Sequence, residues 1–162
     1  MWKRYIDRPV GRAELESLQA LARAEKESFF ARNPHLVQAY ADRFIGVALC
    51  QGAALQYLGR GYGVNDFDLH FFYAQNPAKP RLARAVKSTW ATVGCFENFR
   101  VDFIRTVVPP CVGASAQEDR VELLRAFLRK PPTENARHLA QKGVIGLLPE
   151  ELFHKVIWEP AV

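Results

Sequence analysis

The stretch from Phe44 to Tyr73 constrains the fold of this chain more than any other part of the sequence. It begins with a short apolar run of strand-forming residues, Phe44-Ile45-Gly46-Val47-Ala48-Leu49-Cys50, which predicts a buried strand. That strand stops at Gly52, and Ala53-Ala54-Leu55-Gln56-Tyr57-Leu58 has the composition of a helix that begins just beyond a glycine turn. Free backbone N–H groups and the positive end of the helix dipole then point at one spot, which suits a phosphate.

The second half of this stretch, Asp66 to Tyr73, predicts a strand that carries two acids. Because strand side chains alternate between faces, Asp66, Asp68 and His70 share one face. The rise from the first acid to the second is about 6.6 Å, which allows both carboxylates to converge on a pair of metal ions. Without a cation, two carboxylates about 6 Å apart repel by roughly 3 kcal/mol at an effective dielectric near 20. A divalent ion with oxygen ligands would offset that repulsion, and His70 is a further candidate contact for metal or substrate.

A third acid lies on a later run of strand-forming residues, Phe99 to Val108, in which Asp102 is the single carboxylate. If this strand pairs beside the first acidic strand, about 4.8 Å away, Asp102 completes a cluster with Asp66 and Asp68. These three residues are therefore the predicted metal-binding and catalytic set.

The same residues resemble a known family. Gly52-Ala53, a gap of twelve residues, Asp66-Phe67-Asp68-Leu69 and then Val101-Asp102-Phe103 resemble the pattern of the nucleotidyltransferase superfamily that includes DNA polymerase beta. Within this superfamily, the amino-acid pattern looks most like that of the small antibiotic and toxin-system nucleotidyltransferases. The resemblance implies an α/β fold, a mixed sheet flanked by helices with a helical C-terminal segment. It also implies transfer of a nucleoside monophosphate from an NTP to a hydroxyl of RNA, a protein or a small molecule.

The resemblance also implies residue roles. Asp66 and Asp68 would bind two Mg²⁺ (or Mn²⁺) ions, and Asp102 would bind the second ion and help to remove the acceptor proton. Backbone N–H groups at Gly52 and Ala53 would hold phosphate. In the glycine-rich loop that follows, Arg60 is a candidate phosphate contact, with plain solvent exposure as its alternative.

Three positions depart from the family pattern. Ala53 stands where a hydroxyl residue usually touches the triphosphate, Gln51 where a second glycine is common, and Val64 where the toxin-system branch has serine. These changes leave the carboxylates intact but weaken the expected hold on a nucleotide. The alternative is a catalytically degraded nucleotidyltransferase-like module that binds a protein partner or RNA, and a third reading is an unrelated α/β protein.

Composition predicts one globular domain of 162 residues, with helices over 1–42, a core over 43–110 and a helical tail over 111–162. The net charge of +5 favours anionic partners such as a nucleotide or RNA. No apolar run approaches eighteen residues and no signal peptide is evident, so we expect a cytoplasmic location and no membrane association. The three cysteines, an odd number without a close pair, predict neither a disulfide framework nor a zinc site.

Apolar periodicity predicts the remaining elements. We expect a basic helix over Arg81 to Trp90, with its cations along one side, either as a solvated face or as a surface for an acceptor or RNA. The other predicted helices are 12–32, a short one through Leu36 to Tyr40, one from Ala116 to Lys130, Ala136 to Gln141, and Pro149 to about Trp158.

Overall fold

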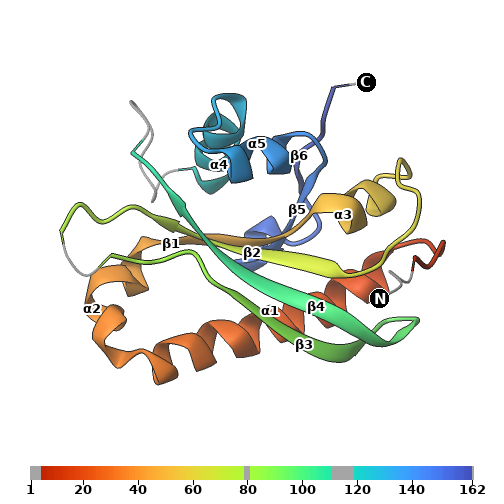
Figure 1. Ribbon diagram of the computed structural model, residues 1–162, viewed down its shortest axis with the longest axis horizontal. Helices are drawn as coiled ribbons and strands as arrows, with labels where there is room; N and C mark the ends of the chain where they lie inside the picture. The colour runs from red at the N-terminus through yellow and green to blue at the C-terminus, as the bar shows by residue number, and fades with distance from the viewer. Residues whose placement is uncertain (1–4, 79–80, 111–118, 162) are drawn as a thin grey trace.

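The computed structural model describes residues 5–78, 81–110 and 119–161, and its centre is a six-stranded mixed sheet with the order β3-β4-β2-β1-β5-β6 (Figure 1). Neighbouring strands are antiparallel except β2 and β4, which are parallel. The strands are β1 (Phe44–Cys50), β2 (Phe67–Ala74), β3 (Val86–Val93), β4 (Phe96–Val108), β5 (Val144–Leu148) and β6 (Val156–Trp158).

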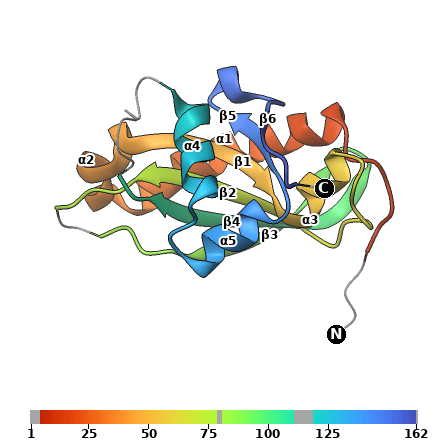
Figure 2. The ribbon, with the colours of Figure 1, turned by 90° about the horizontal axis from the view of Figure 1, so that it is seen from above.

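Helices cover both faces of the sheet, so the molecule has three layers (Figures 1 and 2). The long helix α1 lies on one face, and α4 and α5 lie on the other. This arrangement confirms the expected α/β class, a mixed sheet flanked by helices. The helices are α1 (Arg12–Arg32), α2 (Val37–Tyr40), α3 (Gln51–Tyr57), α4 (Arg120–Arg129) and α5 (Glu134–Ala140), with 3₁₀ turns at Pro34–Leu36, Ala41–Arg43 and Glu150–Leu152.

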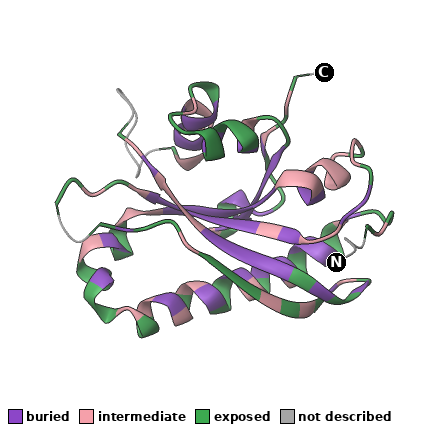
Figure 3. Ribbon diagram, viewed as in Figure 1, coloured by how far each residue is buried: buried purple, intermediate pink, exposed green. Residues whose placement is uncertain are grey.

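The side chains of β2 alternate between the two faces of the sheet, as the sequence predicted, and the hydrophobic core forms one cluster on each face. Phe67, Leu69 and Phe71 pack into the cluster under α1, whereas Phe72 packs into the cluster under α4 and α5 beside Phe127. The central strands are accordingly buried, and exposed residues lie on the outer sides of the helices (Figure 3). Asp68 belongs to the same face as Phe72, so the acids lie on the α4–α5 side.

Polar contacts fix the helical layers to the sheet. On the α1 side, Gln19 Nε2 donates to the Leu147 carbonyl oxygen at 3.0 Å, and Lys87 Nζ pairs with Glu25 at 2.8 Å. On the other side, Arg120 Nη1 donates to the carbonyl oxygens of the first two residues of β1, each at 2.7 Å. Since partly buried charge-assisted bonds are directional, they set where each helix lies along the strands.

The predicted basic helix over Arg81 to Trp90 is wrong. The segment is irregular up to residue 85 and then enters strand β3, which forms an antiparallel hairpin with β4. The hairpin turn contains Gly94, whose φ of 54° is easily reached by glycine. Arg81, Arg84 and Lys87 are three residues apart, which resembles helical spacing. The sequence showed no strand pattern against it, because this edge strand is largely exposed and has no clean apolar alternation.

The predicted last helix from Pro149 is also wrong. The chain forms β5, a 3₁₀ turn and β6, and β5 pairs with β1 in the middle of the sheet. Every residue of β5 is buried, which explains why its sequence is a continuous apolar run. The sheet therefore extends beyond residues 43–110, and the tail is only partly helical. The segment 111–118, which includes the predicted helix start at Ala116, lies outside the described residues.

Within the described part of the chain, the helices are all too short or too polar to cross a membrane.

Candidate metal and substrate site

The strand register brings the three acids together. In the parallel pair β2–β4, Asp68 lies directly opposite Asp102. Asp66 lies just before β2, and one carboxylate oxygen from each of the three residues lies within 4.8 Å of the others. The predicted pairing of the two acidic strands is thus confirmed, and the cluster has the oxygen donors that divalent cations prefer.

The proximity of the three acids affects the pKa of Asp68. Burial, followed by the charges of Asp66 and Asp102, raises the pKa of Asp68 to about 7, although Arg100 and Lys142 act in the opposite direction. Two nearby cations therefore do not balance three acids in this partly buried position. The cluster fits a divalent ion, because such an ion would supply the missing positive charge.

Neighbouring side chains hold Asp102 in place. The residue is 6% exposed, and its Oδ1 accepts hydrogen bonds from Ser88 Oγ at 2.6 Å and Arg100 Nε at 2.9 Å. Ser88 lies opposite Asp102 on β3, and Arg100 lies two residues earlier on the same face of β4. Both bonds go to one oxygen, so Oδ2 carries neither of them.

The turn after β1 lies beside the second acid. Cys50, the last residue of β1, is the register partner of Asp68. The turn residue with the left-handed backbone is Gln51 (φ 64°), and Gly52 lies inside the first turn of α3, which corrects the expected glycine turn. A Cβ added to Gly52 would meet nothing within 4 Å, so open space borders the backbone here. Ala53 is 2% exposed and packs into the α1-side cluster, so it offers no hydroxyl and little surface to a ligand.

Arg60 contacts the C-terminal segment. Its Nη1 donates to the Pro160 carbonyl oxygen at 2.9 Å and lies 3.3 Å from Glu159 Oε1. A phosphate contact from this side chain would have to replace or share those partners.

His70 lies on the same face as the acids but is buried, with 3% exposure. Its Nδ1 lies 2.8 Å from Thr106 Oγ1, and its Nε2 is buried without a hydrogen-bond partner among the described residues. Burial, followed by the charge of Arg84, lowers the pKa of His70 to about 3, so the ring stays neutral at physiological pH.

Sequence reasoning missed Ser88, Arg100 and Lys142 around the acids. Arg100 was detectable, because residues two apart on a strand share a face and it precedes Asp102 by two. Ser88 and Lys142 were not, since their positions depend on β3 and β5, two strands that the sequence did not reveal.

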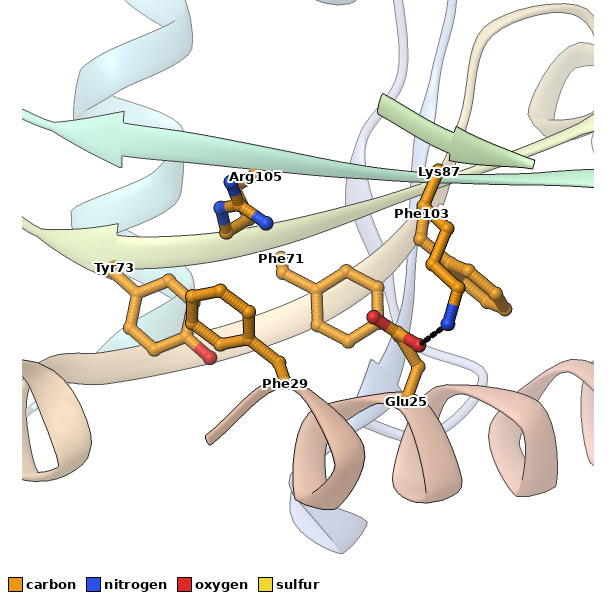
Figure 4. A pocket seen from close by; sticks show the side chains of 7 residues that line it. All are labelled: Glu25, Phe29, Phe71, Tyr73, Lys87, Phe103 and Arg105. Carbon is orange, nitrogen blue, oxygen red and sulfur yellow. Dashed lines mark hydrogen bonds and ion pairs between the residues drawn. The ribbon is translucent and has the colours of Figure 1, made fainter. Parts of the chain in front are cut away.

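On the opposite face of the sheet, the cavity between α1 and strands β2 to β4 is too small for a substrate. A cavity of about 20 Å³ there is lined by residues of α1, β2, β3 and β4 (Figure 4). Arg105 lies over the ring of Phe29 at 4.5 Å, and the Tyr73 hydroxyl has no partner among the described residues. The volume is about that of a single water molecule.

Comparison with protein-family models and with curated proteins finds no match for this chain, so the case for a function rests on the residues described above.

Proposed function

We propose that this protein is a metal-dependent nucleotidyltransferase that moves a nucleoside monophosphate from an NTP to a hydroxyl group of an acceptor. The observation that supports the proposal most strongly is the convergence of Asp66, Asp68 and Asp102 within 4.8 Å beside the turn that follows β1. The proposal includes a cytoplasmic location, where NTPs and Mg²⁺ are present together.

The acids would hold Mg²⁺ or Mn²⁺. When bound, such ions supply positive charge to the triphosphate and lower the pKa of the acceptor hydroxyl. Asp66 and Asp68 would hold both ions, and Asp102, which lies opposite Ser88 of β3, would hold the second. Because Ser88 and Arg100 fix its Oδ1, Asp102 enters the reaction already oriented, which saves the cost of ordering it.

The reaction forms one bond and breaks one bond. The acceptor oxygen bonds to the α-phosphorus of the NTP while the bond from that phosphorus to the bridging oxygen breaks, and pyrophosphate leaves with the electron pair. Asp102 helps to take the proton of the acceptor hydroxyl. The backbone N–H groups of Gly52 and Ala53, the ammonium group of Lys142 and, from the neighbouring loop, Arg60 are the candidate donors to the phosphates.

The second candidate function is a module that keeps this fold without catalysis and binds RNA or a protein, such as a toxin or antitoxin partner. Two observations favour it. Ala53 provides no hydroxyl for a triphosphate, and Arg100 already forms an ion pair with Asp102 at 2.9 Å.

Thermal denaturation with each of the four NTPs separates the two functions. The proposed enzyme should show a higher melting temperature when Mg²⁺ or Mn²⁺ and an NTP are both present, because ligands that bind only the folded state stabilise it. Asp68→Asn should abolish the increase. Asp42→Asn is the matched control, since Asp42 is exposed and lies outside the acid cluster.

The absence of any shift with all four NTPs would contradict the enzymatic proposal and favour the binding module. A positive result leads to incubation with the labelled NTP and cell extract, in which the label should appear on the acceptor and should not appear with Asp68→Asn.

A further inference from the structure

A cavity of about 650 Å³ adjoins the acid-bearing face of the sheet and is bordered by the α4–α5 layer, the segment after β2 and the segment before β3. Its floor includes His70 and Thr106, its walls include Phe127 and Leu139 from the two helices, and the segment before β3 contributes Arg84 among others. The volume falls in the usual range of small-molecule sites.

The cavity and the acid cluster share one face of the same two strands. His70 follows Asp68 by two residues on β2, and Thr106 follows Asp102 by four on β4. One strand repeat spans about 6.6 Å, so the floor of the cavity begins one repeat beyond the acids. A ligand that fills the cavity can therefore extend one end toward the cluster.

The floor contains a polar atom without a partner. His70 Nε2 is buried, and no described residue forms a hydrogen bond with it. Buried polar atoms nearly always have partners, so an orphaned one beside a large cavity points to a ligand that supplies the bond.

The cavity also has an excess of positive charge. Arg81 and Arg84 both line it, and within the described ranges neither side chain forms an ion pair. Arg84 and His70 both line the cavity, so this guanidinium group and the histidine ring border the same space. Two unpaired guanidinium groups suit a dianion, and guanidinium groups bind phosphate oxygens in a bidentate manner.

We infer that this cavity binds a small phosphate monoester, with its phosphate against Arg84 and Arg81 and its organic part between Phe127 and Leu139. Building on the proposed function, this molecule is the acceptor, and a hydroxyl group on it faces the acids. A folded or stacked RNA fits the site less well, because the part of the wall formed by Phe127 and Leu139 is apolar and the cavity has the volume of a small-molecule site.

Phenyl phosphate is a suitable probe, because it combines a phosphate dianion with an apolar ring. Isothermal titration calorimetry is performed in EDTA without NTP, so that the measurement does not depend on the metal or on catalysis. The wild-type protein should bind phenyl phosphate at millimolar concentrations or below, and it should not bind phenol. Arg84→Gln should weaken binding by about tenfold or more, because a charge-assisted pair is lost.

Arg137→Gln is the matched control. Arg137 is an exposed arginine on α5 that does not line the cavity, so its loss should leave the affinity unchanged. Circular dichroism shows whether each variant is folded, and Arg81→Gln provides a second test of the phosphate contact. Asp68→Asn should retain phenyl phosphate binding while it loses the response to Mn²⁺ and NTP.

Absence of binding, or binding that Arg84→Gln and Arg81→Gln leave unchanged, would overturn the inference. Arginine-dependent binding of a short single-stranded RNA without binding of phenyl phosphate would also overturn it and assign the surface to RNA. If phenyl phosphate binds through Arg84 but no NTP shift occurs, the proposed function fails and the phosphate ester site stands.

Discussion

Asp68 lies between two other acids with its carboxyl group largely withdrawn from water, and its pKa is raised from 3.8 to about 7. Between these two values the folded protein holds a proton that the unfolded chain has released. By linkage, the contribution of this group to stability is fully present below about pH 4 and is lost as the pH rises through about 7. The metal-free fold is thus strained at neutral and alkaline pH by a group that metal binding would use.

Asp68→Asn should remove this strain. In EDTA at about pH 8 the variant should resist urea better than the wild type, by about 1–3 kcal/mol, since each pKa unit corresponds to about 1.4 kcal/mol. At about pH 4 the difference should nearly vanish, because the wild-type carboxyl group is then protonated. Urea unfolding at both pH values measures the effect, and an unchanged difference between them would contradict the raised pKa.

Gly52→Ala separates stability from function at the turn after β1. A Cβ at this position would meet no atom within 4 Å, and alanine favours a helix over glycine by about 0.5–1 kcal/mol, so stability should stay equal or rise. If the backbone of Gly52 holds phosphate, the methyl group should reduce the melting-temperature shift produced by Mn²⁺ and NTP. A variant that keeps the full shift would show that phosphate binds elsewhere.

At the scale of elements, β5 shows how closely the sheet and the following 3₁₀ turn are packed. A Cβ on Gly146 would lie 2.1 Å from the Leu152 carbonyl oxygen, which belongs to the backbone and cannot rotate away. Gly146→Ala should therefore destabilise the protein by about 1–3 kcal/mol or more. Chemical denaturation beside Gly52→Ala, where the same substitution meets open space, provides the comparison, and equal stabilities would refute the close packing.

The elements that could be predicted from the sequence are those whose own residues show a pattern typical of a helix or a strand. β2 alternates acid and apolar residues because one face is core and the other carries the site, so both its type and its faces were predictable. β3 and β5 lack such alternation for opposite reasons, since β3 is largely exposed and β5 is buried throughout. Their identity as strands comes from pairing with β4 and β1, which are distant in sequence. The acid cluster was therefore predictable, whereas Lys142 and the cavity, which depend on where β5 and α5 lie, were not.

At the scale of the molecule, the two core clusters lie on opposite faces of one sheet, so both helical layers pack on the same strands. Unfolding should be a single cooperative transition. Two of the three tryptophans lie at opposite edges of the sheet. Trp90 is on β3, and Trp158 on β6 donates to the Ala140 carbonyl oxygen at 2.8 Å. Tryptophan fluorescence and far-ultraviolet circular dichroism should thus give the same urea midpoint, and separate midpoints would indicate an independently unfolding layer.

The two faces of the sheet differ in what they carry, and this difference has a practical consequence. The face under α1 carries the larger core cluster, whereas the three acids lie on the other face, which the large cavity adjoins. Substitutions that improve packing on the α1 side can therefore raise thermal stability without touching the acid cluster. Stability and the properties of the acid-bearing face can be engineered separately and then combined in one chain.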